Sequence, residues 1–263
     1  MNSFIARELR DQILTITLTR TAKRNALTSA MYDELSQALE DAETDPEVRV
    51  ILLQADGDNF TAGNDIPDFI EHSTAPGSSE PAAFRFVRNL GAASKPIVAA
   101  VQGNAVGVGA TLLLHCDLVY LADNARLVAP FVNLALVPEA ASSWLMPLRI
   151  GHVRAYAMFA LGEPIDASTA LQAGLANAVV PAAEVRARAA AAASALARQS
   201  VGALAATKLL MRERSTIAAR IEEERTFFLE RLKSPEALAA FEAFTARAAS
   251  ASSSPKSGEG HAG

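Results

Sequence analysis

Residues 102–111, QGNAVGVGAT, stand between two apolar runs, Ile97–Val101 and Leu112–Leu114. The glycines concentrate where a buried strand is expected to turn into a buried helix. The first turn of a helix leaves its amide N–H groups without intrahelical partners and lies at the positive end of the helix dipole. Such a turn can bind an anion or stabilise a developing oxyanion. Tight packing of strand against helix would explain the same glycines equally well.

Strands and helices are expected to alternate around this stretch. Apolar, β-branched runs predict strands at 4–9, 12–19, 48–54, 97–101 and 117–122. A helix capped by Thr28 or Ser29 is expected to end near Asp45, and another is expected around Phe84–Leu90. The alternation predicts an α/β fold with a largely parallel sheet and helical crossovers.

The second half of the chain, from Val153, is expected to be mostly helical. Asp166 is a predicted cap of a short helix that Gly174 ends, and Ser234 is a predicted cap before Pro235. The alanine-rich stretch 182–206 is interpreted as packed helix. The last residues, ASSSPKSGEGHAG, are too polar to bury a core and predict a flexible tail.

The composition is that of a soluble globular protein. The 263 residues are 50% hydrophobic and 20% charged, and the net charge is −5. No basic stripe is present, so nucleic acid is not an expected partner. The single cysteine, Cys116, excludes an intrachain disulfide and a cysteine-based zinc site. We find neither a secretory signal nor an apolar run that could span a bilayer, and we expect a cytoplasmic protein without membrane contact.

A second glycine-containing turn, FTAGNDI at 60–66, follows the strand expected at 48–54. In parallel α/β sheets, ligands bind outside the carboxyl ends of strands. Two amides that converge there on one carbonyl oxygen form an oxyanion hole, and the loss of one such donor typically costs about 3–4 kcal/mol of transition-state stabilisation. We expect the two turns to meet. Pro67 is expected to limit regular structure, and 71–81 to form a surface loop.

Three motifs in register resemble the crotonase (enoyl-CoA hydratase/isomerase) superfamily. They are FTAGNDI at 60–66, QGNAVGVGATLLLHCD at 102–117 and APFVNLALVPEAASSWLMP at 129–147, and the resemblance runs from about residue 5 to about residue 247. It implies a spiral of ββα units, acyl-CoA thioester substrates of fatty acid metabolism, and a homotrimer or dimer of trimers. No metal or cofactor is implied, since CoA is part of the substrate.

The resemblance also implies a division of the chain and a set of site residues. Residues 1–195 would form the spiral core with the CoA site, 196–249 a C-terminal helical trimerisation region, and 250–263 the tail. The oxyanion amides would be those of Ala62 and Val108. The substrate would lie along Lys23, Arg24, Ala26, Ala62, Asn64, Asp65, Ile66, Gly107, Phe131, Leu134 and Trp144. Thr21 stands where the first family motif usually has proline.

The acidic residues distinguish between the reactions of the superfamily. Hydration of a 2-enoyl thioester uses two glutamates, and the matched positions here are Thr111 and Phe131. Neither side chain can act as a general base at neutral pH. The remaining candidate is Glu139, which resembles the single catalytic glutamate of the Δ3,Δ2-enoyl-CoA isomerases. Its alternative interpretation is a first-turn helix carboxylate favoured by the helix dipole.

The sequence therefore predicts a Δ3,Δ2-enoyl-CoA isomerase in which Glu139 shuttles one proton from C2 to C4. Apolar walls that include Phe131, Leu134, Leu136 and Trp144 are expected to raise the pKa of Glu139. A hydratase-type member and a non-catalytic acyl-CoA-binding protein are the alternatives.

Other polar residues are given structural roles. Asp65 is interpreted as a capping or loop residue, His115 as a core or interface histidine, and Asp117 as the anchor of a strand start. Ser142 and Ser143 are interpreted as helix caps.

Overall fold

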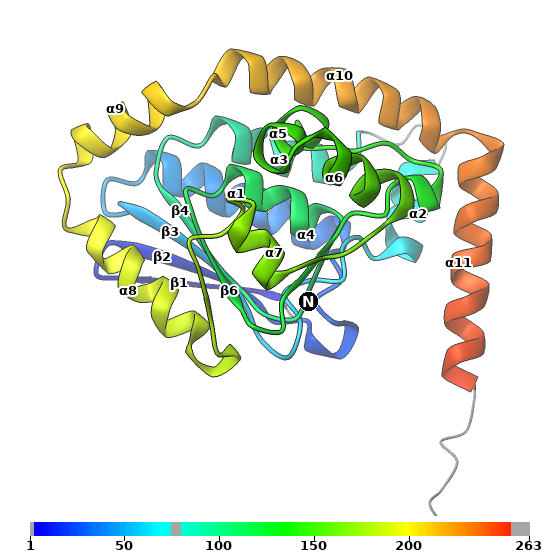
Figure 1. Cartoon of the computed structure of the whole chain (residues 1–263), viewed down its shortest axis with the longest axis horizontal. Coiled ribbons are helices and arrows are strands. Elements are labelled where there is room, and N and C mark those ends of the chain that lie inside the picture. The colour runs from blue at the N-terminus through cyan, green and yellow to red at the C-terminus, as the bar shows by residue number, and fades with distance from the viewer. Residues whose placement is uncertain (1–2, 75–79, 254–263) are drawn as a thin grey trace, which may run out of the picture.

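The computed structural model describes residues 3–74 and 80–253 and contains a six-stranded sheet beside a three-stranded one (Figure 1). The order of the larger sheet is β1-β2-β3-β4-β6-β9, in which only the β1–β2 pair is antiparallel. Its strands are β1 (Ile5–Arg10), β2 (Ile13–Leu18), β3 (Val50–Ala55), β4 (Ile97–Val101), β6 (Leu118–Ala122) and β9 (Ala178–Val180). The smaller sheet contains β5 (Asn104–Val106), β7 (Arg126–Val128) and β8 (Ile165–Asp166). The expected α/β fold with a mostly parallel sheet is confirmed.

Helices cover both faces of the larger sheet. They are α1 (Ser29–Thr44), α2 (Ile66–Thr74), α3 (Ala82–Ala92), α4 (Val108–Thr111), α5 (Ser142–Ile150), α6 (His152–Tyr156), α7 (Ala167–Gln172), α8 (Val185–Ala197), α9 (Val201–Met211), α10 (Arg214–Leu232) and α11 (Pro235–Ser253). Short 3-10 turns lie at η1 (Thr21–Lys23), η2 (Leu112–His115), η3 (Val132–Leu134) and η5 (Ala182–Glu184), and a π-helical turn, η4, at Ala157–Leu161. Figure 1 shows α9 and α10 passing over one edge of the molecule and α11 turning down its side.

The alternation of side chains along the strands separates two apolar cores. On β3, Ile51 and Leu53 belong to the larger core, whereas Val50 and Leu52 face α8 in the smaller one. This arrangement follows from the period of two in a strand, which sends successive side chains to opposite faces. Both faces of the sheet are therefore buried at β3, which has the continuous apolar sequence typical of such a strand.

The expected helix caps are present. The Met31 amide donates to Thr28 Oγ1 at the start of α1, and the Thr169 amide donates to Asp166 Oδ1 at the start of α7. Ser234 accepts a hydrogen bond from the Ala237 amide at the start of α11. These contacts involve residues three apart in the chain, so sequence alone can predict them.

Four expectations about local structure are corrected. Helix α2 begins at Ile66, although Pro67 was expected to limit regular structure; a proline in the first helical turn has no N–H to leave unpaired. Helix α2 also occupies 71–74 of the expected surface loop, and 75–79 lie outside the described residues. The stretch 182–206 is interrupted between α8 and α9, where Ser200 caps the second helix. Helix α11 continues to Ser253, so the expected tail is helical over its first residues, and 254–263 lie outside the described residues.

No helix in 3–74 or 80–253 has the length and apolar character needed to cross a membrane. The proposed division of the chain at residue 195 stays a prediction.

The two glycine-containing turns meet, as the sequence predicts. The Thr61 amide donates to Asn104 O at 3.1 Å, and the Val106 amide donates to Thr61 O at 3.0 Å, which forms a parallel bridge between Thr61 and Ala105. A Cβ added to Gly109 would lie 2.3 Å from Thr61 Cγ2. Glycine at this position therefore permits the close approach of the turns, so the tight-packing interpretation of the glycines is correct here.

This close approach gives a stability prediction. We expect Gly109→Ala to lower the free energy of unfolding by about 1–3 kcal/mol, because the added methyl overpacks the contact between the turns. Thr61→Ser removes the opposing methyl and keeps the hydroxyl that donates to Asn25 O. The double variant should regain most of the lost stability in denaturant unfolding at a matched protein concentration. Gly202→Ala on α9, where nothing lies within 4 Å of the added Cβ, is the control. A Gly109→Ala variant as stable as the wild type would contradict the prediction.

Candidate active site

A cavity of about 580 Å³ opens where the two turns meet and extends between α2, α3, α10 and α11. Most of its lining is apolar and aromatic. The lining residues are Tyr32, Ala62, Gly63, Asn64, Ile66, Phe69, Ala83, Phe84, Val87, Val106, Gly107, Val108, Pro130, Phe131, Asn133, Leu134, Leu136, Glu139, Phe228, Phe241 and Phe244. Glu139 is the one carboxylate among the described residues in this set, so any acid–base chemistry here by a side-chain carboxylate must use it.

The amide of Val108 is available to a ligand. Val108 is the first residue of α4, where a helix has no intrahelical acceptor for its N–H. Gly107 precedes it with φ 56° and ψ −119°, a conformation that favours glycine. Within the described residues no hydrogen bond engages the Val108 N–H. The amide is therefore free beside the cavity in the described part of the chain, and its role as an oxyanion donor stays a prediction.

The amide of Ala62 does not fit the role predicted for it. Its N–H donates to Arg24 O at 2.9 Å. The Gly63 N–H donates to Thr61 Oγ1, and the Asp65 N–H donates to Leu27 O. Within the described residues of the turn, the N–H groups of Asn64 and Ile66 make no hydrogen bond, and both residues line the cavity. Asn64 adjoins Gly63, where an added Cβ would lie 2.9 Å from Val106 O, so it is the one beside the turn that contains Val108. We correct the second candidate oxyanion donor from Ala62 to Asn64.

Tyr32 is a site residue that the sequence analysis missed. It comes from α1, is 2% exposed, lines the cavity, and donates its hydroxyl hydrogen bond to Asn64 Oδ1. Burial, with a smaller contribution from Glu139, raises the pKa of Tyr32 well above its usual value. Tyr32 lies on the buried stripe of α1 with Leu35 and Leu39. A hydroxyl on such an apolar stripe needs a hydrogen-bond partner, and its presence in the sequence could have indicated that Tyr32 is a site residue.

Glu139 is 8% exposed and accepts a hydrogen bond from Thr111 Oγ1 at 2.5 Å. Removal from water disfavours the charged carboxylate and raises the pKa of Glu139 to about 8; the Thr111 hydrogen bond opposes this rise, and the charge of Glu224 adds to it. Helix α5 begins only at Ser142, so Glu139 precedes the helix. Its alternative interpretation as a first-turn helix carboxylate is therefore wrong.

The two positions matched to hydratase glutamates lie beside Glu139 or in the same cavity. Thr111 is fully buried and holds Glu139 Oε1, while Phe131 lines the cavity and packs against Phe159, with ring centroids 6.0 Å apart. A hydroxyl and a phenyl ring thus occupy the places where a second acid would act.

Of the polar residues near Glu139, His115 has the expected role, whereas Ser142 and Ser143 do not. His115 is fully buried, as expected for a core histidine, and burial lowers its pKa to about 3, so the ring is neutral. Ser142 and Ser143, in contrast, are not side-chain caps. Ala141 occupies the N-cap position of α5, and no side-chain hydrogen bond is made from that position. The Ser143 amide donates to Glu224 Oε1 on α10. The acceptor is 81 residues away in the chain, so local sequence could not indicate it.

The residues expected to bind substrate fall into two groups. Ala62, Asn64, Ile66, Gly107, Phe131 and Leu134 line the cavity. Lys23, Arg24, Ala26, Asp65 and Trp144 do not. Trp144 is half-buried and packs against the larger core, so it is not one of the expected walls of the cavity.

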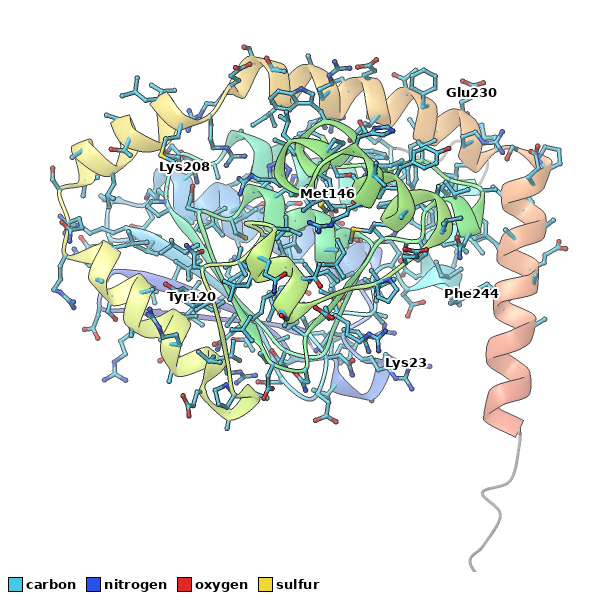
Figure 2. All side chains as sticks on the ribbon, in the orientation of Figure 1. Lys23, Tyr120, Met146, Lys208, Glu230 and Phe244 are labelled. Atoms are coloured by element: carbon cyan, nitrogen blue, oxygen red, sulfur yellow. The ribbon has the colours of Figure 1, made fainter. Side chains whose placement is uncertain are left out.

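Three of the residues outside the lining, Arg24, Ala26 and Asp65, lie in or beside the 60–66 turn. The carbonyl oxygen of Arg24 accepts the hydrogen bond from the Ala62 amide. Lys23 lies at the periphery of the molecule (Figure 2). Arg20 donates to Ala26 O and pairs with Asp65 at 2.6 Å. Asp65 Oδ1 also accepts a hydrogen bond from the Asp68 amide, which agrees with its interpretation as a capping residue.

The residues described by the structure contain no group of three or more His, Cys, Asp or Glu side chains suited to a metal ion. The absence of a metal or cofactor stays a prediction.

Comparisons with known proteins agree with this geometry. The model of the family described as enoyl-CoA hydratase/isomerase matches residues 8–246. The chain is 35% identical over 219 residues to a 2,3-dehydroadipyl-CoA hydratase of Escherichia coli K12, covering 82% of this chain and 86% of that protein. It is 38% identical over 176 residues to enoyl-CoA delta isomerase 2 of Rattus norvegicus, covering 64% of this chain and 44% of that protein.

Solved structures of similar proteins have the same fold. An enoyl-CoA hydratase/isomerase from Pseudoalteromonas atlantica T6c has a TM-score of 0.87 at 37% identity, over 93% of this chain and 98% of that chain. OdaA of Pseudomonas aeruginosa has a TM-score of 0.87 at 42% identity, over 92% of this chain and 99% of that chain. Because relatives are named both as hydratases and as isomerases, the reaction has to be argued from the site. The chain has the crotonase fold and belongs to the enoyl-CoA hydratase/isomerase family.

Proposed function

We propose that this member of the family is a Δ3,Δ2-enoyl-CoA isomerase. The observation that carries the proposal is the single carboxylate, Glu139, among the described residues that line the cavity. Addition of water across a double bond calls for one group to activate the water and another to deliver a proton. Movement of a double bond by a proton shuttle needs only one group that can accept the proton and return it.

In the proposed reaction, Glu139 removes a proton from C2 of a 3-enoyl thioester. The C2–H bond breaks and its electrons spread over the C3–C4 alkene and the carbonyl group, giving a dienolate with negative charge on the thioester oxygen. The amides of Asn64 and Val108 are the proposed donors to that oxygen. The protonated Glu139 then returns the proton at C4, and the double bond ends between C2 and C3. The proton balance closes within the site.

The surroundings of Glu139 support this role. A base with a pKa of about 8 has far more driving force to take a carbon-bound proton than an ordinary carboxylate has. The same apolar surroundings that raise this pKa also limit the access of water, which hydration would require. The chemistry as written needs no metal or redox group, and CoA belongs to the substrate.

The acyl chain is proposed to be uncharged. The far end of the cavity contains Phe69, Phe84 and Phe228, whose rings contact edge to face at centroid distances of 5.5–6.1 Å. Among the described lining residues there is no lysine, arginine or histidine. A terminal carboxylate would therefore be buried without a partner, which is unfavourable by several kcal/mol. An alkyl or aryl chain fits this lining.

We also propose a homotrimer or dimer of trimers in the cytoplasm. Large apolar side chains on the outside of α5, α6, α9 and the π-helical turn are exposed in the single chain: Leu148, Val153, Tyr156, Leu161, Leu210 and Met211. An exposed apolar set of this size supports a subunit interface.

The first functional prediction concerns Glu139. Glu139→Gln keeps the size of the side chain but cannot take a proton, so isomerisation of 3-hexenoyl-CoA should fall by at least about 10²–10⁴-fold. Binding of a CoA ester, measured by calorimetry, should persist because the Asn64 and Val108 amides are unchanged. Conjugation, 3-hydroxyacyl-CoA formation and deuterium exchange at C2 should be followed separately in the wild type. Rapid hydration of 2-hexenoyl-CoA without isomerisation would identify a hydratase, and binding without exchange would identify a non-catalytic protein.

The second functional prediction concerns Thr111. Thr111→Val removes the hydrogen bond that favours the charged carboxylate, so the pKa of Glu139 should rise further above about 8. Because the base must be deprotonated, the rise of kcat/KM with pH should move to higher pH, and activity at pH 7 should fall about tenfold per unit of pKa change. Thr111→Ser retains the hydroxyl and should retain the wild-type profile. Identical profiles for the two variants would refute this role of the hydroxyl.

The third functional prediction concerns the acyl chain. The value of kcat/KM for 3-hexenoyl-CoA should exceed that for the corresponding ω-carboxylate substrate, 3-hexenedioyl-CoA, by at least about a hundredfold, because the second substrate buries an unpaired charge. Both thioesters have the same chain length, so the carboxylate is the only difference. Comparable values would show that the distal pocket accepts a charged end.

A further inference from the structure

Glu224 is a buried carboxylate that the proposed chemistry does not use. It lies on α10, is 5% exposed and is not among the lining residues of the cavity. Its Oε1 accepts a hydrogen bond from the Ser143 amide at 2.8 Å, and its Oε2 is buried without a partner among the described residues. Burial raises the pKa of Glu224 to about 7, against the opposing effect of hydrogen bonds from Ser143 and Ala141. A buried carboxylate is expensive to retain and calls for a specific role.

The segment that Glu224 holds contains Glu139. Two residues of this segment, Ala140 and Ala141, have φ values of 65° and 54°. Non-glycine residues in this left-handed region are strained and persist only when their surroundings hold them. The segment 139–143 therefore needs anchors outside itself if Glu139 is to keep one orientation.

A second anchor holds the same segment at Ala140. His115 Nε2 and Ala140 O are 2.7 Å apart, and Arg212 Nη2 and His115 Nδ1 are 2.9 Å apart. Because His115 is neutral, its Nε2–H donates to Ala140 O and its Nδ1 accepts from the Arg212 guanidinium. Glu224 and Arg212 both belong to the C-terminal helical part of the chain. That part thus binds the Glu139 segment directly through Glu224 and indirectly through the Arg212–His115 pair.

We propose that Glu224 is a positioning residue for Glu139, which holds the strained 139–143 segment through the Ser143 amide so that the Glu139 carboxyl stays against Thr111 and faces the cavity. The proposal rests on the proposed function only in naming Glu139 as the proton shuttle. Glu224 does not contact the substrate cavity and acts through Glu139.

The charge of Glu224 has a second consequence for Glu139. Groups that face Glu139 from the neighbouring elements are Tyr32 on α1, Thr111 on α4 and Glu224 on α10, and the neutral His115 contacts the next residue. Among them Glu224 is the like charge that raises the pKa of Glu139, after the larger effect of burial. Removing the charge while keeping the acceptor oxygen should therefore lower the pKa of Glu139.

Two variants separate position from charge. Glu224→Gln keeps an acceptor for the Ser143 amide and removes the charge, so kcat at its plateau should stay within a few-fold of wild type while the rise of kcat with pH moves to lower pH. Glu224→Ala removes both, so kcat should fall by roughly 10–100-fold, as expected for a misplaced catalytic group, with KM nearly unchanged. Glu223→Gln makes the same charge change at the adjacent exposed residue, which pairs with Arg220. Its charge is the smallest of the contributions that act on Glu224, so plateau kcat should be unchanged and the pH profile should move much less than in Glu224→Gln.

Amide hydrogen exchange provides a readout that does not depend on activity. Exchange across 139–145 should accelerate in Glu224→Ala and remain near wild type in Glu224→Gln and Glu223→Gln. Wild-type exchange together with wild-type kcat in Glu224→Ala would overturn the proposal, as would an unshifted pH profile in Glu224→Gln. If Glu224→Ala does not fold, Glu224→Leu, which keeps most of the side-chain volume but has no acceptor for the Ser143 amide, tests the positioning role by the same measurements of exchange and kcat. A wild-type protein without isomerase activity would defeat the proposed function, while the exchange measurement would still test the positioning role.

Discussion

The backbone pairing of Thr61 with β5 is the constraint on which the rest of the site depends. Thr61 is fully buried, exchanges backbone hydrogen bonds with Asn104 and Val106, and uses its hydroxyl to bind Asn25 O and the Gly63 amide. This pairing brings the ends of two parallel strands together. Beside the cavity, the N–H groups of Asn64 and Val108 make no hydrogen bond within the described residues, whereas those of Ala62, Asp65 and Gly107 bind carbonyl groups of other segments. Without this pairing, neither turn alone would place two donors near one oxygen.

The C-terminal helices complete the site as well as covering the sheet. Phe228 on α10 and Phe241 on α11 close the apolar part of the cavity, and Glu224 on α10 binds the Ser143 amide next to the Glu139 segment. A change in the packing of α10 would therefore alter both the acyl pocket and the orientation of the base. This coupling follows from one helix in which Glu224 and Phe228, about one turn apart, contact two parts of the site.

Sequence predicted the features that depend on neighbouring residues. Thr28, Asp166 and Ser234 cap helices because each cap is a contact over three residues, and the strands at 50–55 and 97–101 follow from continuous apolar runs. The predictions were wrong where a contact between residues far apart in the chain determines the role of a residue. Ser142 and Ser143 were interpreted as caps, but neither caps α5, and the Ser143 amide donates to Glu224 on α10. Ala62 was chosen as a donor, but its N–H binds Arg24 O, and which amide of a turn is left unengaged depends on the segments beside it.

The sequence by itself determined the family resemblance and the order of strands and helices. It also determined which acidic side chains are available: a glutamate at 139, with threonine and phenylalanine at the positions matched to hydratase glutamates. Only the tertiary structure decided that Thr111 binds Glu139, that Tyr32 binds Asn64, and that α10 contacts the Glu139 segment. The physical reason is distance along the chain. Residue identity is local information, whereas the Thr111 hydroxyl that lowers the pKa of Glu139 and the Glu224 charge that raises it come from segments 28 and 85 residues away, which only folding brings together.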